Sequence, residues 1–332
     1  MPDFPPEAFT RLMPPVRRAP INGVDMAYYE AGPADGPPIV LCHGFPETAF
    51  SWRLQIPALA AAGYRVIAPD QRGYGLTPGP DEVSAYDMAH LTGDLVGLLD
   101  HLGLEKAVFC GHDWGGIVVW QMPLMHPERC AGIIGLNTPF LPRYPVDPIE
   151  LFRKMYGPDN YIVWFQTPGE ADQVLGADVE KTMRFFMRKP AALREAGDKG
   201  SQGGSSFAFG EGLARYSPDG DPNQFLSDEV IGVFTALFQH SGFTGGINWY
   251  RNFSRNWRAS EGLPQRVEGM PCLMIMAEKD AVLSPAMAEG MERHVDRLEK
   301  VLIEGSGHWT QQEAPEAVNQ RILDWMRRHF PA

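Results

Sequence analysis

The sequence predicts an α/β protein with a mainly parallel sheet, helices on both faces and an inserted helical domain. Short apolar runs alternate with stretches of helical periodicity, which is the pattern of a parallel sheet covered by helices. The pattern changes over residues 141–266, where aromatic residues increase and β-branched runs are few. A chain of 332 residues with 44% hydrophobic content can bury one large core and such an insertion. We therefore expect residues 1–140 and 267–332 to form one core domain and residues 141–266 to form a helical cap.

Six apolar runs are expected to be the strands of this sheet. They are 38–42, 64–69, 107–110, 133–136, 271–276 and 300–303. Each is short and is followed by small or charged residues, as expected for strands buried on both faces. Ligands of open α/β sheets bind beyond the carboxyl ends of the strands, so functional side chains are expected in the loops after these runs. Within the cap, the Gly- and Ser-rich patch at 199–206 is interpreted as a flexible surface connection.

Composition excludes several classes of partner. A net charge of −12 and a pI near 5.2 argue against nucleic acid. The N-terminus lacks the basic start and apolar core of a signal peptide, and no apolar run is long enough to span a membrane, so a cytoplasmic protein is expected. The four cysteines lie in apolar stretches without CxxC spacing, which predicts buried thiols and neither a metal site nor a cofactor. The sequence leaves open whether the chain forms a homodimer.

The loop after the run at 107–110 carries the most informative motif, Gly111-His112-Asp113-Trp114-Gly115-Gly116. Gly-x-Asp-x-Gly between a strand and a helix predicts a sharp turn whose tip side chain stands clear of the sheet. A carboxylate at that tip attacks saturated carbon and leaves an alkyl-enzyme ester, which favours an epoxide or an alkyl halide as the electrophile. Asp113 is therefore the candidate nucleophile. Taken alone, the motif could also be an ordinary aspartate turn.

An acid and a base follow the last two expected strands. Asp280 comes just after 271–276 and His308 just after 300–303, which gives the order nucleophile, acid, base along the chain. Asp280 would accept the Nδ1 hydrogen of His308, and His308 would take a proton from water. Glu278 is the alternative acid. The backbone N–H groups of Phe45 and Trp114 are expected to form an oxyanion hole.

Four core segments together resemble the soluble epoxide hydrolases of the α/β-hydrolase superfamily. They are 43–48, 70–75, 111–116 and 307–311. The resemblance runs from about Asn22 onward and includes the cap segments 161–169 and 248–252. It implies an α/β-hydrolase core with an inserted helical cap, a small-molecule epoxide as substrate and a cis peptide bond at Phe45–Pro46. The chain has no counterpart of the phosphatase-like domain of vertebrate members, so a single activity is expected.

The same resemblance implies that Tyr161 and Tyr250 bind the epoxide oxygen. Ring opening releases an alkoxide, and a phenol can donate a hydrogen bond to it without carrying charge at neutral pH. Tyr156 is the alternative to Tyr161. The indole side chains expected to contact substrate are those of Trp114, Trp249 and Trp309.

Two other readings of the same motifs stay open. Haloalkane and haloacid dehalogenases use an aspartate nucleophile too, and the haloalkane enzymes carry a tryptophan after it, so Trp114 does not discriminate. The two tyrosine segments favour an epoxide, because a halide leaving group needs no acid. Fluoroacetate dehalogenases share His-Gly-Phe-Pro but typically carry arginine where this chain has Trp114. A non-catalytic binding protein on the same fold is the third reading.

Overall fold

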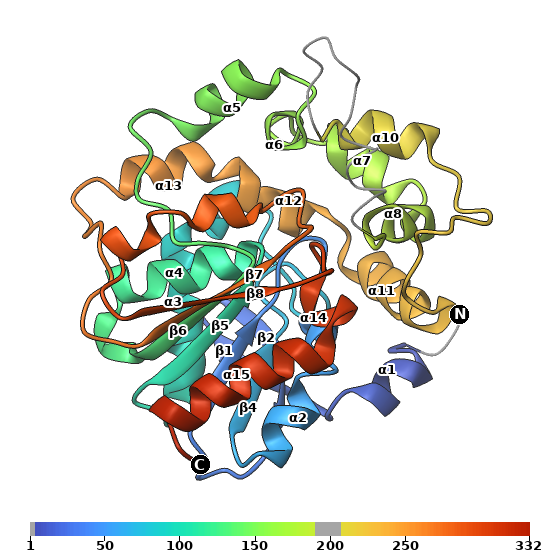
Figure 1. Ribbon diagram of the computed structural model, residues 1–332. Coiled ribbons are helices and arrows are strands. Elements are labelled where there is room, and N and C mark those ends of the chain that lie inside the picture. The colour runs from blue at the N-terminus through green and yellow to red at the C-terminus, as the bar shows by residue number, and fades with distance from the viewer. Residues whose placement is uncertain (1–3, 190–206) are drawn as a thin grey trace.

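Eight strands form one sheet in the middle of the core (Figure 1), and their order is β1-β2-β4-β3-β5-β6-β7-β8. The computed structural model describes residues 4–189 and 207–332, so the patch at 199–206 lies outside the described residues. The strands are β1 (Val16–Ile21), β2 (Val24–Ala31), β3 (Pro38–Cys42), β4 (Arg65–Pro69), β5 (Ala107–His112), β6 (Cys130–Leu136), β7 (Cys272–Ala277) and β8 (Leu298–Ile303). The pairings from β4 through β8 are parallel. The predicted α/β class and all six expected strands are confirmed.

The hairpin of β1 and β2 is an element that the sequence analysis did not predict. Its two-residue turn is Asn22-Gly23, with φ angles of 45° and 84°. Positive φ at both positions is what this kind of hairpin turn requires, and asparagine and glycine adopt it most readily. β2 also pairs antiparallel with β4, so the hairpin extends the parallel sheet at one edge.

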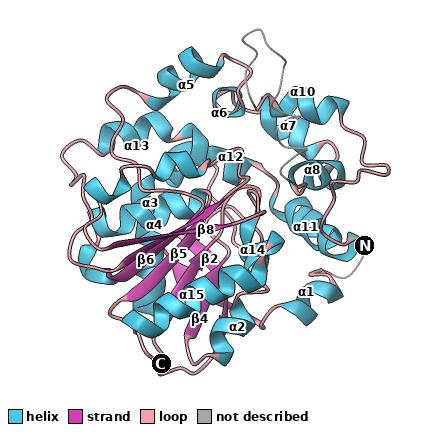
Figure 2. Cartoon of the chain, in the orientation of Figure 1, coloured by secondary structure: helices cyan, strands magenta, loops and turns pink. Residues whose placement is uncertain are grey.

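Helices cover both faces of the sheet (Figure 2). On one face α4 (Trp114–Met125) packs on β5 and β6 and against α3 (Met88–His101). On the other face α15 (Pro315–His329) contacts β7, β8 and α2 (Ile56–Ala61). The short helices α1 (Glu7–Leu12) and α14 (Thr310–Glu313) complete the core helices. Because both faces are covered, the central parallel strands are almost wholly apolar, with every residue of β5 buried.

Eight further helices lie between β6 and β7 in the described part of the chain. They are α5 (Pro148–Tyr156), α6 (Tyr161–Trp164), α7 (Glu170–Gly176), α8 (Val179–Phe186), α10 (Phe209–Arg215), α11 (Asp228–Ser241), α12 (Thr244–Arg251) and α13 (Phe253–Ala259). They are grouped on one side of the sheet (Figure 1) and fall inside the segment 141–266 expected to be a cap. The division of the chain at 140 and 266 itself stays a prediction.

Local sequence explains where several of these helices begin. Asp147 accepts a hydrogen bond from the N–H of Ile149, and proline follows it at the first position of α5. Ser227 caps α11 in the same way through the N–H of Val230. Such side chains satisfy amide groups that the first helical turn leaves without partners.

The cap rests on the core through a close approach of two glycines. A Cβ added at Gly245, in α12, would lie 2.4 Å from the carbonyl oxygen of Gly73. Nearby, the indole N–H of Trp249 donates to the carbonyl oxygen of Arg72 at 3.2 Å. α12 therefore lies directly on the loop after β4, with backbone close to backbone.

The four cysteines are buried and free, as the sequence predicted. Among the described residues, no helix is both long and apolar enough to cross a membrane. Over residues 4–189 and 207–332, no group of three or more His, Cys, Asp or Glu side chains is arranged to hold a metal ion.

Candidate active site

Asp113 stands at the tip of a strained turn between β5 and α4. Its φ and ψ are 52° and −121°, a backbone conformation that residues other than glycine rarely adopt. The turn needs small neighbours, because a Cβ at Gly115 would lie 2.1 Å from the carbonyl oxygen of Cys42. The hydroxyl of Thr138 donates to the carbonyl oxygen of Asp113 at 2.8 Å and supports the turn from the loop after β6. The tip residue is thus held firmly in place.

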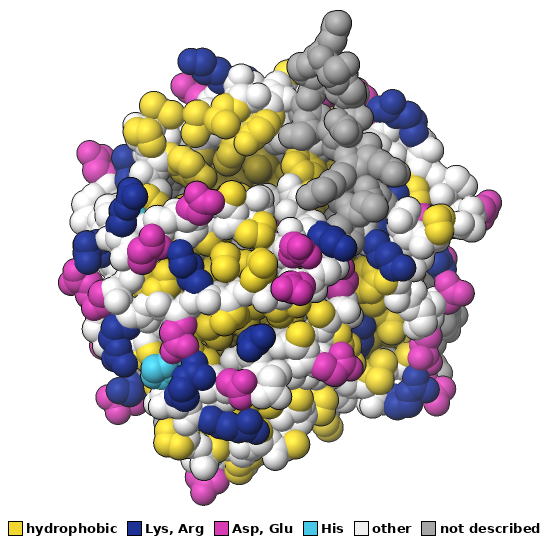
Figure 3. All heavy atoms as spheres, viewed as in Figure 1, with side chains coloured by type: hydrophobic (Ala, Val, Ile, Leu, Met, Phe, Trp, Pro, Cys, Tyr) yellow, Lys and Arg dark blue, Asp and Glu magenta, His cyan; other side chains and the backbone are white. Residues whose placement is uncertain are grey.

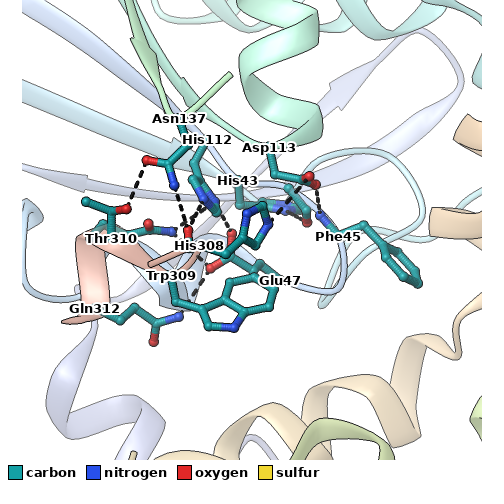
Figure 4. Close-up of polar contacts among 12 residues, drawn as sticks. His43, Phe45, Glu47, His112, Asp113, Asn137, His308, Trp309, Thr310 and Gln312 are labelled. Atoms are coloured by element: carbon teal, nitrogen blue, oxygen red, sulfur yellow. Dashed lines mark hydrogen bonds and ion pairs between the residues drawn. The ribbon is translucent and has the colours of Figure 1, made fainter. Parts of the chain in front are cut away.

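Two backbone amides point at the carboxylate of Asp113. The N–H of Phe45 donates to Oδ1 at 2.8 Å (Figure 4), and the N–H of Trp114 also bonds to the carboxylate. Gly44 lets the loop after β3 come this close, since a Cβ there would lie 2.4 Å from Oδ1. The peptide bond between Phe45 and Pro46 is cis, as expected. The other oxygen of the carboxylate, Oδ2, is left facing His308.

His308 lies between two carboxylates. Its Nδ1 is 2.9 Å from Oδ2 of Asp280, and its Nε2 is 3.7 Å from Oδ2 of Asp113. The second oxygen of Asp280 accepts the N–H groups of Val282 and Leu283 at 2.8 and 2.9 Å. The alternative acid Glu278 is instead exposed and accepts the N–H of Gly305. The structure therefore brings Asp113, His308 and Asp280 together and leaves Glu278 outside the group.

Burial and the neighbouring charges set the protonation of this group. Burial disfavours the charged form of His308, but the ion pair with Asp280 outweighs it and raises the pKa of the imidazole to about 9. Burial also opposes the charge of Asp280, yet His308 and the bonded amides lower the pKa of that carboxyl to about 2. For Asp113, burial prevails and raises the pKa, although the charge of His308 opposes it. Near neutral pH the free site therefore holds an imidazolium beside the ionised carboxylate of Asp280.

A buried pair of side chains, His112 and Glu47, lies behind His308. The Nδ1 of His112 is 2.8 Å from Oε2 of Glu47, and its Nε2 is 2.7 Å from the carbonyl oxygen of His308. A carbonyl can only accept, so Nε2 donates to it and fixes the backbone of the base (Figure 4). Gln311 donates to Oε1 of Glu47 at 3.0 Å. His112 and Glu47 entered the sequence analysis only within the segments 111–116 and 43–48, and neither residue was given a role.

Asn137 is a second residue that sequence reasoning missed. It follows β6 with φ of 62°, and its Nδ2 donates to Oδ2 of Asp280 at 2.7 Å and to the carbonyl oxygen of His308 at 3.1 Å. Its Oδ1 accepts the hydroxyl of Thr310 at 2.9 Å. One amide thus ties together the loops that carry the acid and the base. The signal available in the sequence was a polar residue directly after an expected strand, Asn137 after 133–136.

A cavity of about 560 Å³ opens above the carboxylate, and its wall includes Asp113, Trp114, Tyr161 and Tyr250. The two tyrosine rings come from α6 and α12, and their centroids lie 5.7 Å apart. Phe165 packs against both, at 5.6 Å from Tyr161 and 5.0 Å from Tyr250. Burial raises the pKa of each phenol above its usual value, and the charge of Asp113 adds to the effect. Both phenols therefore stay protonated and able to donate.

The outer part of this cavity is apolar. It is formed by α5, α13 and the loop after β7, through side chains such as Phe152, Tyr156, Phe253 and Met287. Figure 3 shows hydrophobic side chains gathered around a hollow beside α5. Tyr156, the alternative to Tyr161, stacks on Phe152 in this outer part and is 37% exposed. It belongs to the wall farther from the carboxylate.

Two predicted substrate contacts are corrected by the structure. Trp249 and Trp309 are buried, but neither is among the described residues that line the cavity. The indole N–H of Trp249 donates to the carbonyl oxygen of Arg72, and that of Trp309 to the carbonyl oxygen of Phe186 at 2.8 Å. Each ring is therefore fixed between the core and the cap. Of the three tryptophans, the structure places only Trp114 on the cavity wall.

The family described as alpha/beta hydrolase fold matches residues 37–315, and the sheet order and the turn at Asp113 agree with it, so the chain is an α/β-hydrolase. It is 43% identical to Epoxide hydrolase A of Mycobacterium tuberculosis over 317 residues, which cover 94% of this chain and 97% of that protein. The chain belongs to the epoxide hydrolase family of this fold.

Two further proteins that this chain resembles are also epoxide hydrolases. The crystal structure of Epoxide Hydrolase A from Mycobacterium thermoresistibile superimposes with a TM-score of 0.87 at 42% identity and covers 95% of this chain and 98% of that one. Bifunctional epoxide hydrolase 2 of Mus musculus is 42% identical over 309 residues, which are 92% of this chain and 54% of the mouse protein. The chain therefore spans about half the length of this bifunctional relative.

Proposed function

We propose that this protein hydrolyses epoxides to vicinal diols through an ester on Asp113. The observation that carries the proposal is that a carboxylate nucleophile and two protonated phenols, Tyr161 and Tyr250, line one buried cavity. An epoxide needs both at once: a nucleophile for carbon and a donor for the oxygen. The names of the relatives support the same substrate class.

In the first step, Oδ2 of Asp113 attacks a ring carbon and the bond from that carbon to the epoxide oxygen breaks. The oxygen stays attached to the substrate as an alkoxide, held by hydrogen bonds from the two tyrosines, and takes a proton from one of them, whose phenolate is protonated again from water. Oδ1 is already bound by the N–H of Phe45, so Oδ2 is the oxygen free to attack. The product is a neutral ester of Asp113 with a hydroxyl on the adjacent carbon.

In the second step, His308 takes a proton from water, and the resulting hydroxide attacks the ester carbonyl carbon of Asp113. The N–H groups of Phe45 and Trp114 stabilise the oxyanion. As it collapses, the bond from the carbonyl carbon to the substrate oxygen breaks, and this oxygen takes the proton held by His308 and leaves as the diol. The carboxyl group of Asp113 then gives up its proton to His308, which restores the free site. Esterification removes the negative charge of Asp113, which is one of the charges that raise the pKa of His308. The first step therefore lowers the pKa of the imidazole and makes it available as a base for the second.

Parallel incubation with styrene oxide, 1-bromobutane and fluoroacetate tests the proposal against the dehalogenase readings. We expect diol from styrene oxide and little bromide or fluoride. Asp113→Ala should lower diol formation by at least about a thousandfold and leave the thermal unfolding transition in place, because the side chain supplies the bond-forming atom. Glu278→Ala is the matched control, since this exposed acid lies outside the group. Bromide or fluoride release without diol would refute the proposal.

A cytoplasmic location and self-association are further parts of the proposal. Among the described residues, no helix is long and apolar enough to span a membrane. Cell fractionation tests the location, and light scattering at several protein concentrations tests for a homodimer.

A further inference from the structure

One basic side chain lines the cavity, and it lies away from the reacting carboxylate. Of the described lining residues, Arg143 is the single lysine or arginine, and the charged lining residues besides it are Asp87 and Asp113. Asp87 is already paired with His90 and Arg255 at 2.7 and 2.9 Å. Arg143 therefore carries the one positive charge among the described lining residues, on a wall whose other side chains are mostly apolar.

The side chain of Arg143 is held in position but retains free donors. Its guanidinium lies over the ring of Trp257 at 4.3 Å, and its Nε donates to the carbonyl oxygen of Trp257 at 3.1 Å. The backbone N–H of Arg143 donates to Gln265 at 2.6 Å, which fixes the segment as well. Among the described residues, no carboxylate forms an ion pair with it, so both Nη groups are available to a ligand.

A row of aromatic rings connects this arginine with the nucleophile. Trp114, next to Asp113, lies 4.9 Å from Phe253, which lies 6.1 Å from Phe152. Phe152 is in turn 6.2 Å from Tyr144, the neighbour of Arg143. All four rings line the cavity. A bound molecule can therefore lie along an apolar wall with one end at the carboxylate and the other at a guanidinium.

We infer that Arg143 is a specificity-determining residue that binds a carboxylate at the far end of an elongated, apolar epoxide. The inference rests on the proposed function, because it assumes that the epoxide of the same molecule reaches Asp113. A planar guanidinium with two free Nη groups matches a carboxylate in a bidentate arrangement. The net charge of −12 would otherwise disfavour an anionic substrate, so a local cation is what such a substrate requires.

The test compares two probes that differ only in charge: a terminal epoxide of medium chain length ending in a carboxylate, and the primary amide of the same acid. Arg143→Met should lower kcat/KM for the acid by about tenfold, mainly through KM, and change kcat/KM for the amide by less than about twofold. Arg143→Lys should restore part of the loss. Arg258→Met is the matched control, since this exposed arginine of α13 pairs loosely with Asp147 at 3.7 Å.

A second measurement does not depend on turnover of the acid. A linear alkanoic acid should inhibit styrene oxide hydrolysis by the parental protein and by the Arg258→Met control. It should inhibit the Arg143→Met variant about tenfold more weakly. Added salt should weaken this inhibition, because the contact is partly exposed. Equal losses for acid and amide, or unchanged inhibition in Arg143→Met, would overturn the inference while leaving epoxide hydrolysis intact. Failure to open styrene oxide and both probes would instead overturn the proposed function.

Discussion

Asp113 combines a rare backbone conformation with a charge withdrawn from water. The two amides that bond to this carboxylate stabilise it before the reaction and stabilise the oxyanion after it, so the same donors serve both steps. His308 approaches from the opposite side, with Nε2 3.7 Å from Oδ2, which is longer than a hydrogen bond. Nucleophile and base are thus close but not bonded, as expected if they act in successive steps.

Replacing the base should stop the cycle halfway. Attack by Asp113 needs no base, whereas hydrolysis of the ester needs water to lose a proton, so His308→Gln should form the ester and keep it. Intact-mass measurement after excess styrene oxide should show the protein plus one substrate. An unmodified mass, with the variant folded, would contradict this order of events. Gln320→Ala, at an exposed position of α15, serves as the matched control and should show no adduct.

The balance between the two steps should depend on pH. Hydrolysis needs neutral His308, so it slows as the pH falls below the pKa of the imidazole, which is about 9 in the free site and lower in the ester. Esterification needs ionised Asp113. Burial raises the pKa of this carboxyl group, and the hydrogen bonds from the N–H groups of Phe45 and Trp114 oppose that rise. The fraction of protein present as ester should therefore rise as the pH is lowered from about 9 to about 6. Rapid-quench mass measurement at a series of pH values tests this prediction, and a flat or opposite trend would contradict it.

The site residues predicted from the sequence are those whose role follows from a position at a strand end. Asp113, Asp280 and His308 each follow an expected strand, and the fold brings such loops together. Asn137 and Glu47 act through hydrogen bonds to residues far away in the sequence, which no local pattern records. The indole of Trp249 illustrates the opposite error, because a large aromatic residue beside a predicted donor turned out to anchor the cap.

At the scale of elements, the parallel strands were predictable and the first hairpin was missed for a specific reason. β1 and β2 contain several polar residues and lie at the edge of the sheet, so they lack the continuous apolar runs of the central strands. The available signal was Asn22-Gly23, the dipeptide most typical of a two-residue hairpin turn. The cap helices were expected as a group, but their bounds depend on side-chain caps and tertiary packing.

The contact between α12 and the core can be tested through its glycine. In Gly245→Ala the new Cβ would lie 2.4 Å from the carbonyl oxygen of Gly73, so backbone must move, at a cost of about 1–3 kcal/mol in unfolding free energy. The shift should also displace Tyr250 and lower turnover. Gly232→Ala in α11 is the matched control, because nothing lies within 4 Å of its added Cβ, and it should be neutral or stabilising. Denaturant unfolding that finds the two variants equally stable would contradict the prediction.

At the scale of the whole molecule, the site is divided between two parts of the chain. The core supplies the nucleophile, base, acid and oxyanion donors, and the helices between β6 and β7 supply the two phenols. The ring of Phe45, whose backbone N–H is one of the oxyanion donors, packs on Tyr250 with ring centroids 5.4 Å apart, so the two parts are in direct contact at the site. This division separates chemistry at carbon from activation of the leaving oxygen.

That separation gives a prediction that distinguishes an epoxide from a halide. An epoxide oxygen leaves as a strongly basic alkoxide, so it gains much from the two phenols, whereas bromide is a weak base and gains little. Tyr161→Phe and Tyr250→Phe should each slow esterification by styrene oxide by about tenfold or more, and the double variant should be nearly inactive yet folded. Tyr156→Phe, in the outer wall, is the matched control and should keep the parental rate. Any esterification of Asp113 by a reactive alkyl bromide should persist in all of them. If the double variant opened epoxides at the parental rate, or if bromide release fell in parallel, the phenols would be packing residues and the donors would have to be sought elsewhere in the cavity.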